Sequence, residues 1–124
     1  MACILIVDDD ESIRRMLTQM LERGGYEVFN AQDGNVALKM CDQTSFDLVI
    51  TDLIMPEKEG IETIKEIKEN FPTMNIIAMS GGGRIRPENY LKIAGSLGAA
   101  CTLTKPIERK KLLAAVKALV KEDI

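Results

Sequence analysis

The sequence predicts a single α/β domain built as a (βα)5 doubly wound parallel sheet. Its 124 residues, 46% of them apolar, suit one domain with its own core. Short apolar runs rich in β-branched residues alternate five times with amphipathic stretches. Because connections between parallel strands are right-handed, five such units build an open sheet with helices on both faces. We therefore expect residues 1–124 to form one domain.

Five apolar runs, each bounded by polar residues or glycine, predict the strands. Continuous apolar runs of this length are typical of strands that are buried on both faces. They are CILIV at Cys3–Val7, YEVF at Tyr26–Phe29, FDLVI at Phe46–Ile50, MNIIAM at Met74–Met79 and ACTL at Ala100–Leu103.

Helical periodicity fills the intervals between these strands. Apolar residues recur at three and four positions along the first, third and fifth helices, which places them on core faces. They are Ile13, Met16, Leu17, Met20 and Leu21, then Ile61, Ile64 and Ile67, and later Leu112, Val116, Leu119 and Val120. The second helix, about 33–41, has a weaker pattern, and the fourth, about 87–97, begins at a proline suited to a first turn. Breaks are expected at Gly24-Gly25, Pro72 and Gly98.

Composition excludes several classes of chemistry. The chain has no histidine, so imidazole triads, histidine-liganded zinc and a phosphohistidine within this chain are excluded. A formal net charge of −3 argues against a surface for nucleic acid or anionic membranes. Cys3, Cys41 and Cys101 are odd in number and far apart, which predicts reduced core thiols and a cytoplasmic location. The N-terminus lacks the basic region of a signal peptide, and its apolar run is too short to span a membrane.

Polar side chains follow four of the predicted strands. Parallel strands end at one edge of their sheet, and ligands bind beyond that edge, so these side chains should converge. We interpret Asp10 as a helix cap. The residues at this edge are Asp8, Asp9 and Asp10, then Thr51 and Asp52, then Ser80, and finally Thr104, Lys105 and Pro106.

The acidic members of this group point to a cation. Asp8, Asp9 and Asp52 would repel one another at close range unless positive charge lay among them. Mg²⁺ takes oxygen ligands and keeps several waters, so it is the natural occupant, and Lys105 supplies a second positive charge. Carboxylate, Mg²⁺, lysine and the Ser80 hydroxyl are the equipment of phosphoryl transfer. Asp52, at the end of the central strand, is the candidate nucleophile.

Four stretches contain the ends of these strands and the residues that follow them. They are ILIVDDDESIRRML, FDLVITDLIMPEKEG, IIAMSG and GAACTLTKPI. With them the whole chain closely resembles the receiver domain of two-component response regulators, the CheY-like family. This resemblance implies the flavodoxin-like strand order 2-1-3-4-5. It also implies a cis peptide bond between Lys105 and Pro106, an isomer that is uncommon even before proline.

The resemblance implies a role for each residue at this edge. Asp52 would accept a phosphoryl group from a sensor histidine kinase or a histidine phosphotransfer protein. Asp8, Asp9 and Asp52, with the backbone carbonyl of Ile54, would bind Mg²⁺. Ser80 would be the switch hydroxyl, and Lys105 would contact the phosphoryl oxygens.

The family's mode of signalling is implied as well. Phosphorylation would switch binding on the face formed by the fourth helix, fifth strand and fifth helix, toward a protein effector or a second copy in a homodimer. No direct contact with nucleic acid or membrane is expected. The chain would not be an enzyme in the ordinary sense, because it would catalyse only its own phosphorylation and slow autodephosphorylation.

Several positions depart from the family pattern. Thr102 occupies a position that is commonly aromatic, so we expect the loop after the fourth strand and the fourth helix to carry the signal instead. The GGGRIR segment, Gly81–Arg86, is longer and richer in glycine than usual and is expected to form a mobile loop. Neither Ile54 nor Gly82 has a side chain that can orient water, which predicts slow loss of the phosphoryl group.

Two other classes of function are alternatives to this prediction. One is an aspartate-based phosphohydrolase or a flavodoxin-like nucleotide-binding protein. Against it, Leu53 and Ile54 follow Asp52 where the hydrolases have a second aspartate, and only Tyr26 and Tyr90 could stack a flavin. The other is a degenerate receiver that serves as a passive interaction domain, which the intact set of acidic, hydroxyl and lysine side chains opposes. A stand-alone receiver and a fragment of a larger regulator are both compatible with the sequence.

Overall fold

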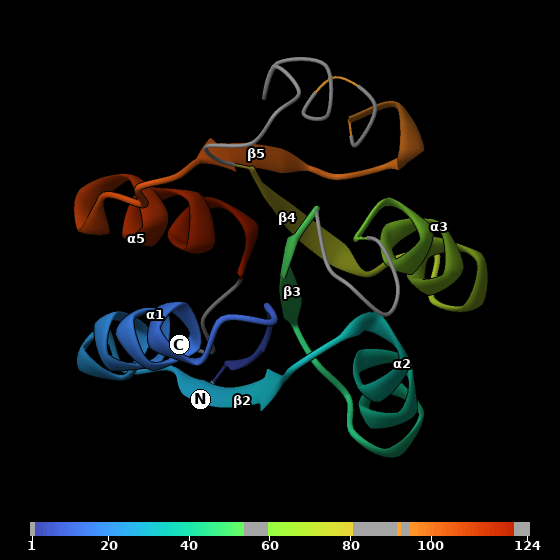
Figure 1. The fold of residues 1–124 in the computed structure, drawn as a ribbon, viewed down its shortest axis with the longest axis horizontal. Helices are drawn as coiled ribbons and strands as arrows, with labels where there is room; N and C mark the ends of the chain where they lie inside the picture. The colour runs from blue at the N-terminus through green and yellow to red at the C-terminus, as the bar shows by residue number, and fades with distance from the viewer. Residues whose placement is uncertain (1, 54–59, 81–91, 93–94, 121–124) are drawn as a thin grey trace.

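Five parallel strands form one sheet in the order β2-β1-β3-β4-β5 (Figure 1). The computed structural model describes residues 2–53, 60–80, 92 and 95–120. This arrangement confirms the doubly wound fold and the strand order 2-1-3-4-5. The strands are β1 (Cys3–Val7), β2 (Glu27–Ala31), β3 (Leu48–Asp52), β4 (Asn75–Ser80) and β5 (Cys101–Thr104).

Helices cover both faces of this sheet. Figure 1 shows α1 (Glu11–Arg23) and α5 (Arg109–Leu119) on one side, with α2 (Gly34–Gln43) and α3 (Gly60–Asn70) on the other. Of the helix expected over 87–97, only Lys92 and residues 95–97 are described, and these are helical. Among the described helices, none has the length and apolar content to cross a membrane.

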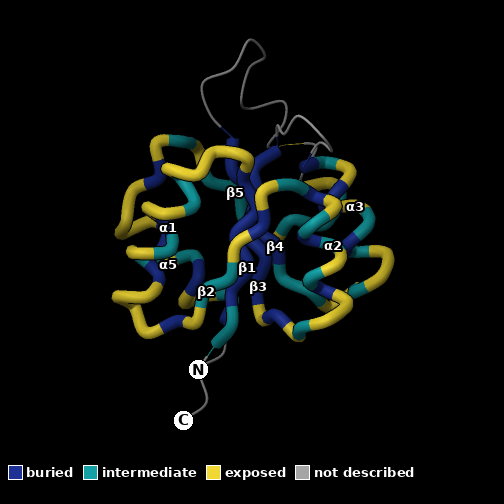
Figure 2. The backbone as a smooth tube through the Cα atoms, turned by 60° about the horizontal axis from the view of Figure 1, so that its bottom comes forward, coloured by how far each residue is buried: buried dark blue, intermediate teal, exposed yellow. Residues whose placement is uncertain are grey.

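The central strands are buried between two separate cores. Successive residues of a strand point to opposite faces of its sheet, so each strand contributes to both cores. Leu5 and Val49 pack with residues of α2 and α3, whereas Ile4 and Ile50 pack with residues of α1 and α5. Figure 2 shows the buried strands running between the two pairs of helices. Burial on both sides explains why the strands are apolar without alternation.

Polar and glycine residues mark the beginnings and ends of helices where the sequence predicts. The Asp10 side chain accepts hydrogen bonds from the backbone N–H groups of Ser12 and Ile13, which confirms it as the N-cap of α1. Gly25 has a φ of 92° and Gly98 a φ of 113°, a region that glycine occupies without strain. The expected breaks after α1 and before β5 are therefore confirmed.

Four strands lie one or two residues later than predicted. β3 was expected over Phe46–Ile50 but covers Leu48–Asp52, and β2, β4 and β5 are shifted in the same direction. The reason is that neighbouring strands supply ladder partners for polar residues: Asp52 pairs with Met79, and Ser80 pairs with Thr104. Asp52 is thus the last residue of the central strand and does not follow it.

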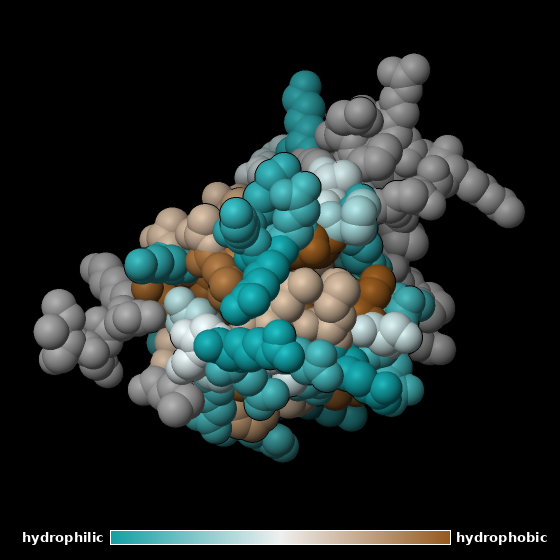
Figure 3. All heavy atoms as spheres, turned by 90° about the vertical axis from the view of Figure 1, so that its left-hand side faces the viewer, coloured by the Kyte–Doolittle hydropathy of each residue, from teal (hydrophilic) through white to brown (hydrophobic). Residues whose placement is uncertain are grey.

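The outer surface of α1 shows one further difference from the prediction. Met16 was expected on the core face, but it is 36% exposed. It precedes the buried Leu17 by one residue, about 100° around the helix, so it lies beyond the edge of the apolar stripe. Figure 3, which views the side carrying α1 and α5, shows hydrophilic side chains over much of the described surface with apolar patches between them.

Candidate functional site

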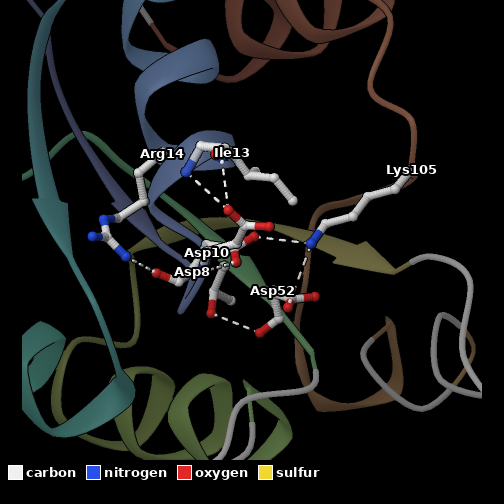
Figure 4. A network of polar contacts seen from close by, with 8 residues as sticks. Asp8, Asp10, Ile13, Arg14, Asp52 and Lys105 are labelled. Carbon is white, nitrogen blue, oxygen red and sulfur yellow. Dashed lines mark hydrogen bonds and ion pairs between the residues drawn. The ribbon is translucent and has the colours of Figure 1, made fainter.

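Charged side chains from three separate elements meet at the carboxyl ends of the strands. Asp8 follows β1, Asp52 ends β3 and Lys105 follows β5. The Lys105 Nζ lies 2.9 Å from Asp8 Oδ2 and 3.5 Å from Asp52 Oδ2 (Figure 4). Asp9 completes the group, because carboxylate oxygens of Asp8, Asp9 and Asp52 all lie within 4.8 Å of one another. The structure therefore brings together four residues from three distant parts of the chain.

Asp8 is fully buried and uses every polar group that it has. Its N–H donates to the carbonyl of Ala31 at 3.2 Å, and its own carbonyl accepts from Arg14 Nη1 at 2.6 Å. Its Oδ1 accepts from the N–H of Asp10 at 2.9 Å, and its Oδ2 accepts from Lys105 at 2.9 Å. A buried carboxylate is costly unless it is paired and hydrogen-bonded, and Asp8 meets both conditions. Its carboxylate is consequently held in one orientation.

Lys105 provides the positive charge of the site. Burial lowers the pKa of this ammonium, but the hydrogen bond to Asp8 and the negative charge of Asp52 outweigh burial, so its pKa is raised above 10.5. The side chain is therefore charged throughout the neutral range. The N–H of Lys105 donates to the carbonyl of Ser80 at 2.6 Å, and the Lys105-Pro106 peptide is cis, as the family resemblance implies.

Asp52 and Ser80 end the neighbouring strands β3 and β4. Asp52 is 7% exposed and Ser80 is 2% exposed, so both are buried at the ends of these adjacent strands. The backbone beneath Asp52 is packed by Gly60, the first residue of α3. A Cβ on Gly60 would lie 1.9 Å from the Asp52 carbonyl oxygen and 2.6 Å from Leu53 Cα. Only a residue without a side chain fits there.

Sequence reasoning did not assign roles to two residues of this site. Arg14 contacts Asp8 from the first turns of α1, and Gly60 packs against the Asp52–Leu53 peptide. The sequence carries only weak signals for them, an arginine six residues after an aspartate and a glycine at a helix start. Ile54, Gly82 and the rest of the GGGRIR segment lie outside the described residues.

The three carboxylates of Asp8, Asp9 and Asp52 have the chemistry of a magnesium site. All its candidate ligands are oxygens, which hard divalent cations prefer. Asp8 and Asp52 are buried whereas Asp9 is exposed, so the group has a protein side and a solvent side. Mg²⁺ usually keeps several waters in proteins, and the solvent side of these carboxylates is where such waters would lie.

Comparison with known proteins identifies the family. The response regulator receiver domain profile matches residues 4–117. The alkaline phosphatase synthesis transcriptional regulatory protein PhoP of Bacillus subtilis is 37% identical over 124 residues, which cover 97% of this chain and 49% of that protein. The transcriptional regulatory protein CpxR of Escherichia coli K12 is 34% identical over 120 residues, covering 97% and 50%. The chain spans about half the length of these curated relatives.

Solved structures agree with this match. The chemotaxis protein CheY4 of Vibrio cholerae superposes with a TM-score of 0.86 at 32% identity, covering 97% of this chain and 99% of that one. The response regulator TrrA of Thermotoga maritima, in complex with Mg(2+)-BeF, superposes with a TM-score of 0.83 at 32% identity, covering 97% and 100%. The fold, the charged edge of the sheet and these relatives together show that the chain belongs to the receiver domains of two-component response regulators.

Proposed function

We propose that residues 1–124 act as one receiver unit that accepts a phosphoryl group on Asp52 from a sensor histidine kinase or a histidine phosphotransfer protein. The observation that carries this proposal is the meeting of three carboxylates within 4.8 Å, beside the Lys105 ammonium. The complex of the related TrrA with Mg(2+)-BeF supports magnesium as the cation. The missing histidine of this chain agrees with a phosphohistidine that belongs to a partner.

Each residue of the site has a defined part in this reaction. A carboxylate oxygen of Asp52 forms a bond to phosphorus while the phosphorus–nitrogen bond of the donor histidine breaks. Lys105 offsets the charge on the phosphoryl oxygens, and the Ser80 hydroxyl acts as the switch that turns toward them. Asp8, Asp9, Asp52 and the Ile54 carbonyl would hold Mg²⁺, which supplies further positive charge to the transferring group. Catalysis is mainly positioning, as is typical of phosphoryl transfer.

The binding face proposed for the effector lies beside this site. Thr102, on β5, lines a hollow of about 310 Å³ together with Lys105, Pro106, Glu108 and Lys111. The lysine of the site thus forms part of the wall of this hollow. A change in the partners of Lys105 on phosphorylation would reach the surface of β5 and α5 directly. We propose that this face, with the fourth helix, binds a protein effector.

Two further features belong to this proposal. The three cysteines are free thiols, which agrees with function in the cytoplasm. Loss of the phosphoryl group is expected to be slow without a partner phosphatase, because the side chains of Ile54 and Gly82 offer no polar group to orient water.

The decisive experiment is an intact-mass measurement after incubation with MgCl₂ and acetyl phosphate. We expect the mass to rise by one phosphoryl group, and Asp52→Asn to abolish the rise. Asp47→Asn is the matched control, because Asp47 is an exposed aspartate just before the start of the same strand. It should be phosphorylated like the unmodified protein. No adduct on the unmodified protein, or an adduct retained in Asp52→Asn, would overturn the proposal.

A further inference from the structure

We propose that Arg14 is a positioning residue that sets the carboxylates of Asp8 and Asp9 for magnesium binding. This inference rests on the proposed magnesium site. Arg14 lies on α1 and is half-buried, and its Nη1 donates to the Asp8 carbonyl at 2.6 Å. Figure 4 shows Arg14 and Lys105 reaching Asp8 from opposite sides. Lys105 contacts the side chain of Asp8, whereas Arg14 contacts its main chain.

The Asp8 carbonyl that accepts from Arg14 affects two of the candidate magnesium ligands at once. It belongs to the peptide group that joins Asp8 to Asp9, so rotation of this peptide turns both residues. The Asp8 N–H on the other side is already fixed by Ala31. Arg14 therefore fixes the one peptide group that two of the three carboxylates share. A hydrogen bond from a charged guanidinium is stronger than one from a neutral donor, which suits it to this task.

The position of Arg14 also has an unfavourable consequence for a bound cation. A guanidinium close to the carboxylates repels Mg²⁺, so charge alone predicts that removing Arg14 strengthens magnesium binding. Positioning predicts the opposite, because misplaced carboxylates bind the cation less well. The sign of the change in affinity thus separates the two effects. Salt separates them further, since the screening length falls to about 3 Å at 1 M ionic strength.

The neighbouring arginine provides a matched control. Arg15 has the same charge and lies one residue farther along α1, but its side chain is 70% exposed and pairs with Glu11 at 3.2 Å. It makes no contact with Asp8 among the interactions of the described residues. Replacing it removes the same charge from the same helix and leaves the Asp8–Asp9 peptide held by Arg14.

The test is a titration of the full, unphosphorylated chain with MgCl₂ alone in 1 M KCl, followed by backbone amide chemical shifts. Arg14→Met is expected to weaken magnesium binding on the order of tenfold, the usual effect of losing a group that orients a metal ligand. Arg15→Met is expected to leave the affinity unchanged. Equal or tighter binding by Arg14→Met, or an equal loss in both variants, would overturn the inference.

Two outcomes would change how the titration is interpreted. If the amide spectrum shows that Arg14→Met is unfolded, Arg14→Lys and Arg15→Lys replace the pair, and only Arg14→Lys should bind magnesium more weakly. If the unmodified protein shows no saturable shifts around Asp8 and Asp52, the proposed magnesium site fails and this inference fails with it. Normal binding by the unmodified protein and by the Arg14 variant would overturn this inference alone.

Discussion

The two ends of the sheet bury different chemistry. At the carboxyl end, Asp8 and Asp52 are buried beside the Lys105 ammonium. At the amino end, a hollow of about 420 Å³ is lined mostly by neutral side chains, among them Cys41, Phe71 and Asn75. The polar contacts at that end have a neutral group as at least one partner: the Asn75 side-chain amide donates to the Leu119 carbonyl at 3.0 Å, and the Asp47 carboxylate accepts from the Cys3 N–H at 2.8 Å.

This difference indicates that the buried charges at the carboxyl end do more than stabilise the fold. Burying opposite charges costs desolvation energy that their attraction often fails to recover, so a buried ion pair is a poor device for stability alone. At the amino end, the charged groups Asp47 and Lys68 of the described residues are hydrogen-bonded to neutral backbone groups and do not rely on a buried pair of opposite charges. The charges at the carboxyl end are therefore best explained by the phosphoryl transfer proposed for them, and each end of the sheet can be tested by mutation.

The largest effect is expected from Gly60→Ala, which disturbs the charged end without changing any charge. The new Cβ would meet the Asp52 carbonyl oxygen at 1.9 Å, so the Asp52–Leu53 backbone has to move. We expect a loss of about 3 kcal/mol in the free energy of unfolding, measured with urea, and a fall in the phosphorylation rate. Gly95→Ala is the control, because nothing lies within 4 Å of its added Cβ and it is helical. Equal stability of the two variants would contradict this account of Gly60.

An intermediate effect is expected when one lysine is removed from each end. Lys105→Met removes the cation between Asp8 and Asp52, and should lower the free energy of unfolding by about 2 kcal/mol. Added MgCl₂ should recover more stability in this variant than in the unmodified protein, because it replaces the lost positive charge. The measurement is urea unfolding at neutral pH with and without MgCl₂.

Lys68→Met is the control at the amino end. The Lys68 Nζ donates to the carbonyls of Pro72 at 2.9 Å and Met74 at 3.0 Å, which are neutral acceptors. This variant should lose about 1 kcal/mol, with no added response to magnesium. The contrast between the two ends would collapse if magnesium stabilised the two lysine variants equally.

The smallest effect concerns the amino end of the sheet and appears only at high pH. Burial, with a smaller contribution from the charge of Asp42, raises the pKa of the Cys41 thiol to about 11. The thiol of an unfolded chain has a pKa of about 8.5. The contribution of Cys41 to stability is therefore complete below that pH and is lost as the pH rises toward the pKa of the folded state. We expect this loss to be about 1 kcal/mol by pH 9. Urea unfolding between pH 8 and 10 should show a shallower decline in Cys41→Ala, and parallel curves would refute the prediction.

The family architecture and most of the charged edge could be predicted because both follow from local patterns. Apolar runs such as CILIV identify buried strands, and parallel strands force the residues after them to one edge. Asp8, Asp52, Ser80 and Lys105 can thus be grouped from their positions in the chain alone. The ends of the strands were less predictable, because a polar residue such as Asp52 stays in the ladder only when a neighbouring strand supplies Met79 as its partner.

The sequence by itself determined which side chains lie at the charged edge of the sheet, since the spacing of apolar residues determines the order of strands and helices. Only the tertiary structure decided how those side chains are held. Arg14 bonds a main-chain carbonyl, and Gly60 leaves room for the Asp52 peptide. Neither contact has a sequence pattern, because each depends on the distance between backbones that only packing sets. The exposure of Met16 was decided in the same way, by how α1 is rotated against the sheet.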